Sequence, residues 1–109
     1  MAVTAKFVEK GDNIDYTATK AIVYMEVVPL ASRIGVALEE IAKSETGTVK
    51  LTGVFELPAA ASLAIAVGDA VYWDSTNSVI NKTATDNIPA GIAVSAKASA
   101  GTTVRVRIG

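Results

Sequence analysis

Hydrophobic and polar residues alternate most regularly along two segments of the chain. Residues 48–57 place one apolar set on a single face of an extended backbone: Val49, Leu51, Gly53, Phe55 and Leu57. Residues 103–108 do the same with Val104, Val106 and Ile108. Because successive side chains of a strand point to opposite sides, a period of two predicts a strand in each segment, with one buried and one wet face.

Shorter apolar segments between turn signals predict further strands. They are rich in β-branched and aromatic residues and lie at residues 14–17, 21–28, 34–38, 70–73 and 90–96. Residues 58–67 fit a short helix begun by Pro58 or a loop across the core, and residues 74–87 fit a hairpin or a long surface loop. About seven short strands with at most one short helix predict an all-β fold, either a small barrel or a sandwich.

The chain of 109 residues has the length of a single domain. Residues 1–20 are polar and weakly periodic, and we expect them to form an N-terminal arm or hairpin ahead of a single β domain at residues 21–109. The halves of that domain resemble each other, with residues 22–25 matching 70–73, residues 35–38 matching 91–94, and residues 47–51 matching 102–106. This pattern is consistent with an internal duplication, in which two similar β-units share one core.

Composition and charge remove several classes of function. The chain has no cysteine and no histidine, so it lacks thiolate and imidazole ligands and the usual general base. We therefore predict no catalytic, cofactor-binding or metal-binding residues, no small-molecule substrate and no enzyme. The net charge of −1, with acidic and basic residues interspersed, argues against nucleic acid as a partner.

A membrane partner is not expected either. The longest uncharged stretch, residues 57–68, is shorter than the ~20 residues that span a bilayer. The first residues lack the basic and apolar pattern of a signal peptide, so we expect a soluble protein that is made in a cytosol.

Carboxylate groups occur in two places, and we interpret both as turns. Glu39, Glu40 and Glu45 lack the spacing of a calcium-binding loop, so they fit a solvated connection. Asp69 and Asp74 flank the strand predicted at residues 70–73, where short polar side chains commonly form turns.

Other side chains are candidates for an interface with another protein. Tyr72 and Trp73 point to opposite sides of their strand; the sequence leaves open which one is exposed, and Trp73 is retained as a candidate anchor. Arg105 and Arg107 form a basic stripe that either meets an acidic protein surface or protects an edge strand from aggregation. Half of the residues are hydrophobic, mostly alanine and valine, which favours self-association.

Several motifs together resemble one family of phage proteins. They are GVFELP at residues 53–58, GDAVYWD at residues 68–74, PAGIA at residues 89–93 and TVRVR at residues 103–107, and the likeness runs from about Phe7 onward. The family is the DUF2190 family, the capsid cement or head decoration proteins of tailed phages and prophages. No single motif is specific, but their order is.

This resemblance implies a structural role in the virion and synthesis in the cytoplasm of the bacterial host. Cement proteins lie on the outer surface of the expanded head, often as homotrimers, bridge subunits of the major capsid protein and stabilise the shell against the pressure of DNA. The first 17 residues are then the expected arm, adding a strand to a capsid protein, and Phe7, Val8, Ile14 and Tyr16 are its candidate interface residues. The alternatives are a tail or baseplate component and a free β-type binding module.

Overall fold

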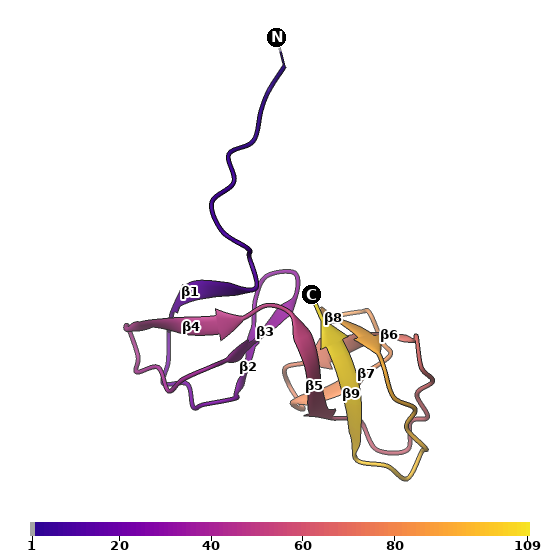
Figure 1. Cartoon of the computed structure of the whole chain (residues 1–109). Helices are drawn as coiled ribbons and strands as arrows, with labels where there is room; N and C mark the ends of the chain where they lie inside the picture. The colour runs from indigo at the N-terminus through magenta and orange to yellow at the C-terminus, as the bar shows by residue number, and fades with distance from the viewer. Residues whose placement is uncertain (1) are drawn as a thin grey trace.

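The computed structural model describes residues 2–109 and contains two antiparallel sheets (Figure 1). Within these residues there are nine strands and no helix: β1 (Asn13–Thr17), β2 (Val27–Pro29), β3 (Ile34–Ala37), β4 (Thr46–Lys50), β5 (Gly53–Pro58), β6 (Ala70–Asp74), β7 (Val79–Asn81), β8 (Ile88–Ala93) and β9 (Thr103–Ile108). The strand orders are β1-β4-β3-β2 and β5-β9-β8-β6-β7. The predicted all-β class is confirmed in its sandwich form, and neither sheet closes into a barrel.

The regular alternation at residues 48–57 belongs to two strands rather than one. β4 ends at Lys50 in the four-stranded sheet, and β5 begins at Gly53 in the five-stranded sheet. Gly53 has φ +124, a conformation that side chains rarely adopt, so the chain changes direction there. The apolar period survives the break because Val49 and Leu57 are both buried, each in its own sheet.

Two other segments differ in detail from the expected elements. Residues 59–69 form a loop with an isolated bridge at Ala59 and another at Ile65, so the helix alternative for residues 58–67 is wrong. Residues 74–87 contain β7, which pairs with β6 as a hairpin. Of the expected strand at residues 21–28, only the last two residues are in β2, and Ile22 makes a single bridge to Ile41.

The core has two parts, which meet at β3. All four residues of β3 are buried, and its side chains face two ways. Ile34 and Val36 join the larger cluster, whose other members are Leu57, Ala59, Ile65, Val71, Trp73, Ile80, Ala90, Ala93, Val104, Val106 and Ile108. Ala37 joins the smaller cluster with Ala18, Ile22, Val28, Ile41 and Val49. A strand buried on both faces therefore ties the two sheets into one body.

The two halves of the chain repeat the same hydrogen bonds. The Met25 N–H donates to the Ala37 carbonyl over 2.8 Å, and the Gly68 N–H donates to the Ala93 carbonyl over the same distance. The bridge between Ile22 and Ile41 has its counterpart between Ile65 and Lys97.

These equivalences fit an internal duplication, with a correction to the expected alignment. Ile22 corresponds to Ile65, and not to Ala70 as the sequence match suggests. The pairing of residues 35–38 with 91–94 holds, because Ala37 and Ala93 accept the equivalent hydrogen bonds.

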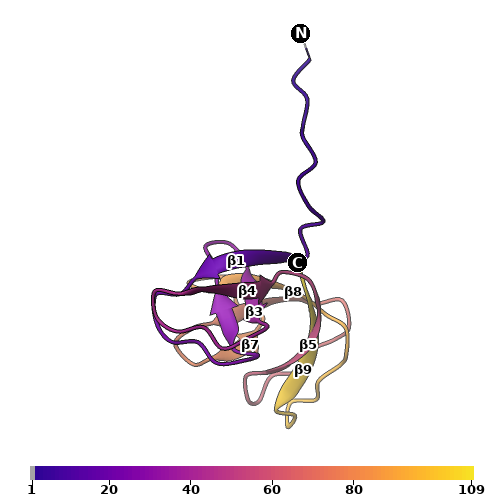
Figure 2. The ribbon, with the colours of Figure 1, turned by 60° about the vertical axis from the view of Figure 1, so that its left-hand side comes forward.

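The N-terminal residues lie outside both sheets. Residues 2–12 run away from the body as an extended segment and are exposed throughout (Figures 1 and 2). Residues 13–17 are strand β1, which pairs with β4 at the margin of the four-stranded sheet. Met1, the first residue of the predicted arm, lies outside the described residues, and the division at residue 20 stays a prediction. None of the described residues lies in a helix long and apolar enough to cross a membrane.

Candidate functional site

The extended segment of residues 2–12, hereafter the arm, presents large apolar side chains to water. Phe7 is 82% exposed, and Val3 and Val8 are similarly uncovered. The arm is fixed only at its base, where the Leu51 N–H donates to the Asp12 carbonyl over 2.7 Å. A segment with this much exposed apolar surface and so little attachment to the body is typical of a partner-binding element.

Ile14 and Tyr16, the other predicted arm residues, lie in β1 rather than in the arm. Their side chains are half-buried and pack against the smaller core cluster. Ile14 stands opposite Val49 and Tyr16 opposite Gly47 in the register with β4. They therefore hold β1 in place, while the other edge of β1 has no neighbouring strand in its sheet.

Trp73 is the buried member of the aromatic pair on β6. It is 6% exposed and belongs to the larger cluster, whereas Tyr72 is half-buried. Part of Trp73 lines a groove of about 350 Å³ between the sheets, together with Val27, Pro29 and Pro58. In the isolated chain Trp73 is thus a core residue and not a projecting anchor.

Arg105 and Arg107 lie on the outer face of the five-stranded sheet, because Val104, Val106 and Ile108 between and after them are buried. Arg105 Nε is 4.0 Å from Glu56 Oε1, and both side chains are well exposed, so this ion pair contributes little stability. Arg107 stands in register between Val54 of β5 and Ile92 of β8.

Val54 and Ile92, with Val94, make this outer face more apolar than the sequence indicated. We refer to Val54, Ile92, Val94 and Arg107 as the outer patch. The alternation placed Val54 on the wet face, and a valine at such a position was the only signal available. The arm and the outer patch are far apart in sequence, and no hydrogen bond or ion pair joins them within residues 2–109.

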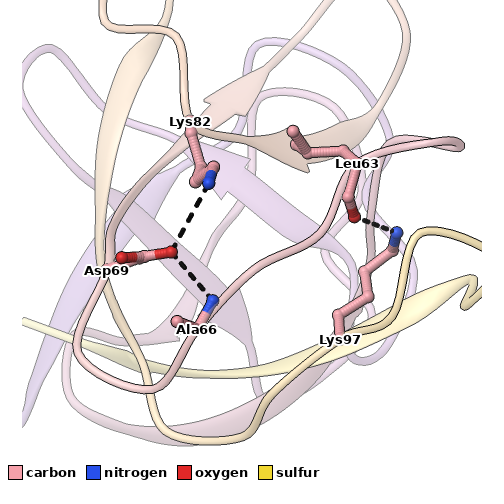
Figure 3. A network of polar contacts seen from close by, with 5 residues as sticks. All are labelled: Leu63, Ala66, Asp69, Lys82 and Lys97. Atoms are coloured by element: carbon pink, nitrogen blue, oxygen red, sulfur yellow. Dashed lines mark hydrogen bonds and ion pairs between the residues drawn. The ribbon is translucent and has the colours of Figure 1, made fainter.

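The carboxylates interpreted as turn residues do form turns. Asp69 accepts a hydrogen bond from the Ala66 N–H over 2.8 Å and lies 3.6 Å from Lys82 Nζ (Figure 3). Asp74 accepts bonds from the side chain and backbone of Asn77 and from the Thr76 N–H, which lowers the pKa of its carboxyl below the ordinary 3.8.

The Glu39 carboxylate also accepts a hydrogen bond from a backbone group, the Thr48 N–H, over 3.0 Å. In the part of the chain that the structure describes, no three acidic side chains gather as a metal site would require.

A buried lysine completes the polar groups near these turns. Lys97 is 4% exposed, and its Nζ donates to the Leu63 carbonyl over 2.6 Å (Figure 3). The same Nζ also donates to the Ala98 carbonyl over 3.2 Å. It occupies the place that Ile41 has in the first half. Its ammonium therefore holds loop carbonyls together and is not displayed to a ligand.

Comparison with protein families gives one match. A family model described as "Phage cement protein" covers residues 8–108 of the 109. No curated protein and no solved structure matches the chain. The matched range takes in both sheets and the part of the arm that follows Phe7.

Proposed function

Since this chain belongs to the phage cement protein family, and so to proteins that associate with the phage capsid, we propose that it decorates the outer surface of the expanded head. There it bridges neighbouring subunits of the major capsid protein and stabilises the shell against the pressure of packed DNA. The role is structural and involves no catalysis.

The arm is the observation that carries this proposal. In an extended segment alternate side chains share a face, so Val3, Ala5 and Phe7 form one apolar row. We propose that this row packs on a capsid subunit while the arm backbone adds a strand to one of that subunit's sheets. β1, which follows the arm directly and has a free edge, supplies a rigid base for it.

Stabilisation follows from binding that only the assembled shell offers. A protein that binds the mature shell but not its separated subunits stabilises the shell by mass action, in proportion to occupancy. A standard interface buries ~800 Å² per partner, and repetition over a closed shell multiplies a modest contact. The remaining exposed apolar residues of the body favour self-association on that surface. We propose a homotrimer, which is the state that the family resemblance implies.

The test is co-sedimentation with empty expanded heads built from the capsid protein encoded with this chain. We expect binding at a fixed ratio and a higher melting temperature for decorated heads than for bare heads. A chain lacking residues 2–11 should lose most of its occupancy, and Phe7→Ala should weaken binding by roughly tenfold to a hundredfold, since burying such a side chain is worth about 1.5–3 kcal/mol. Val67→Ala, which truncates an exposed apolar residue of the body, is the control.

Each outcome separates one part of the proposal from the others. Full occupancy by the chain without residues 2–11 would show that the arm is not the contact. Absence of binding to any maturation state of the head would overturn the decoration role and favour a tail component or a free binding module. The melting temperature of the truncated chain alone should match that of the full chain, because residues 2–11 are exposed and outside both clusters.

A further inference from the structure

One turn is built twice in this fold, once in each half. In the first half the Val23 N–H donates to the Glu26 carboxylate over 3.2 Å, and in the second the Ala66 N–H donates to the Asp69 carboxylate over 2.8 Å. The Glu26 and Asp69 N–H groups each donate over 3.1 Å to the carbonyl three residues earlier. The backbone requirements of the two turns are therefore the same.

The side chains at the two turn tips are not the same. The second tip has Ala66, Val67 and Gly68, with glycine at the left-handed position, φ +92. The first tip has Val23, Tyr24 and Met25, and Met25 adopts φ +67 where glycine would avoid strain. Tyr24 is 65% exposed and Met25 45% exposed, so burial within the chain does not explain this choice.

An exposed aromatic tip and a left-handed methionine therefore stand where the fold needs neither. The other described non-glycine residues with a left-handed φ are small and polar, whereas Met25 is large and apolar; they are Ser44, Ser62, Ser78 and Asp86. Residues held in such a conformation gather at functional sites. We refer to Val23, Tyr24 and Met25 as the apolar tip.

The chain also carries a surface complementary to the apolar tip. Outside the arm and the two turns, the exposed large hydrophobic residues of the described chain are Val54, Ile92 and Val94, all of the outer patch. Arg107, at the centre of the patch, has no carboxylate within 4.0 Å among residues 2–109, unlike Arg105. An aliphatic surface around an unpaired guanidinium suits an aromatic ring, since the cation is attracted to the ring face.

We propose that the apolar tip of one copy packs on the outer patch of a second copy of this chain. Tyr24 lies over Arg107, and Val23 and Met25 contact the flanking aliphatic side chains. The contact joins two different surfaces, so each copy offers one of each, and repetition gives a ring or an open chain. It deepens the self-association included in the proposed function and requires neither the arm nor the capsid.

The size of the tip makes this a weak contact in free solution. Three such side chains bury roughly 300–400 Å², about half of the ~800 Å² per partner of a stable interface. Copies held side by side on a shell meet at high effective concentration, where weak contacts are occupied. Detection in solution therefore needs covalent capture.

The chain has no native cysteine, so introduced thiols react without background. The double variant Val23→Cys with Val94→Cys keeps Tyr24 and Arg107, and it should give covalent dimers and larger products with a short bismaleimide reagent at about 100 µM protein, a concentration suited to a contact below the standard size. The matched control is Ala66→Cys with Val94→Cys, which places the first thiol at the equivalent, also exposed position of the other turn. We expect at least a tenfold lower yield from the control.

Two results would overturn the proposal. Equal yields from the two double variants, or no product from either, would show that the apolar tip has no preference for the outer patch. Products from Val23→Cys alone would show a tip-to-tip contact instead.

The same assay separates this inference from the proposed function. Val23→Cys with Val94→Cys should cross-link equally well in a chain lacking residues 2–11, while co-sedimentation with heads reports the capsid contact alone. Loss of one result therefore leaves the other standing.

Discussion

Replacing Gly91 by alanine tests the closest approach between strands in the five-stranded sheet. Gly91 of β8 stands opposite Ile108 of β9 and has φ +143. A Cβ added to it would lie 2.0 Å from the carbonyl oxygen of Arg107. Real Cβ atoms essentially never approach a heavy atom within 3.0 Å, so β8 and β9 would have to separate by about 1 Å.

Two costs add at Gly91, and other glycines separate them. A side chain at such a φ costs about 1–3 kcal/mol, and overpacking against a backbone atom that cannot rotate away costs about 1–3 kcal/mol. We therefore expect Gly91→Ala to lower the free energy of unfolding by about 2–6 kcal/mol. Gly68→Ala has open space within 4 Å and φ +92, so it should show only the backbone cost, about 1–2 kcal/mol.

Gly35, the counterpart of Gly91 in the first half, supplies the complementary control. Its Cβ would lie 2.4 Å from Val49 Cγ1 and 3.1 Å from the Lys50 carbonyl oxygen, without a left-handed φ. Gly35→Ala should therefore show the packing cost alone, about 1–3 kcal/mol.

The assay is urea unfolding followed by the fluorescence of Trp73, the only tryptophan and a core residue. With a slope of about 1–3 kcal/mol per molar urea, the midpoint of Gly91→Ala should fall by at least about 0.7 M. A midpoint for Gly91→Ala no lower than that of Gly68→Ala would refute the reasoning, since the contact between β8 and β9 would then have relaxed without cost.

Three further changes test other parts of the structure. Lys97→Ala should cost about 2–4 kcal/mol in urea unfolding, because it removes a buried stem and the donor for two carbonyls, whereas Lys82→Ala, which breaks an exposed ion pair, should cost at most about 1 kcal/mol. The hydrogen bonds from Asn77 and Thr76 lower the pKa of Asp74 below 3.8 in the folded chain, so its contribution to stability is present above that pH and is lost as the pH falls through the lowered pKa. The difference in unfolding free energy between the native chain and Asp74→Ala should accordingly shrink below pH ~3.8, and a constant difference from pH 7 to pH 2.5 would contradict this. Met25→Gly should stabilise the isolated chain by up to about 1 kcal/mol, because glycine adopts φ +67 without strain, and its thermal unfolding midpoint should rise. An unchanged or lower midpoint would show that Met25 is not strained.

The all-β class followed from local patterns, and the arrangement of the sheets did not. Periodicity at residues 48–57 correctly assigned the buried side chains Val49 and Leu57. It could not show the change of sheet at Gly53, because both sheets bury the same face of the chain and the period continues across the break. A single glycine in an alternating segment was the available sign of a break, and glycine alone also fits an ordinary strand.

The sequence could predict exposed interface residues only in the arm, where no neighbouring strand determines whether a side chain is covered. Phe7 and Val8 lie in the polar, weakly periodic N-terminal residues that predicted an arm, and both are exposed as an arm requires. Trp73 was undecidable, since β6 has a side chain on each face and only the neighbouring strands determine which face is covered. Identifying the outer patch requires the order of the strands in the sheet. Identifying the apolar tip requires the correct alignment of the two halves, and the sequence match aligned residue 22 with residue 70 instead of residue 65.

The duplication itself separates what the fold requires from what a partner requires. Where the halves agree, as in the carboxylates of Glu26 and Asp69 that close the two turns, the backbone explains the residue type. Where one half has a bulky exposed residue and the other a small one, as at Tyr24 and Val67, the backbone explains neither. The arm precedes the first half only, and the apolar tip also lies in that half. The arm and the apolar tip are exposed to water and are present in one half only, so neither the backbone nor the core accounts for them. A contact with another molecule is the physical reason that remains.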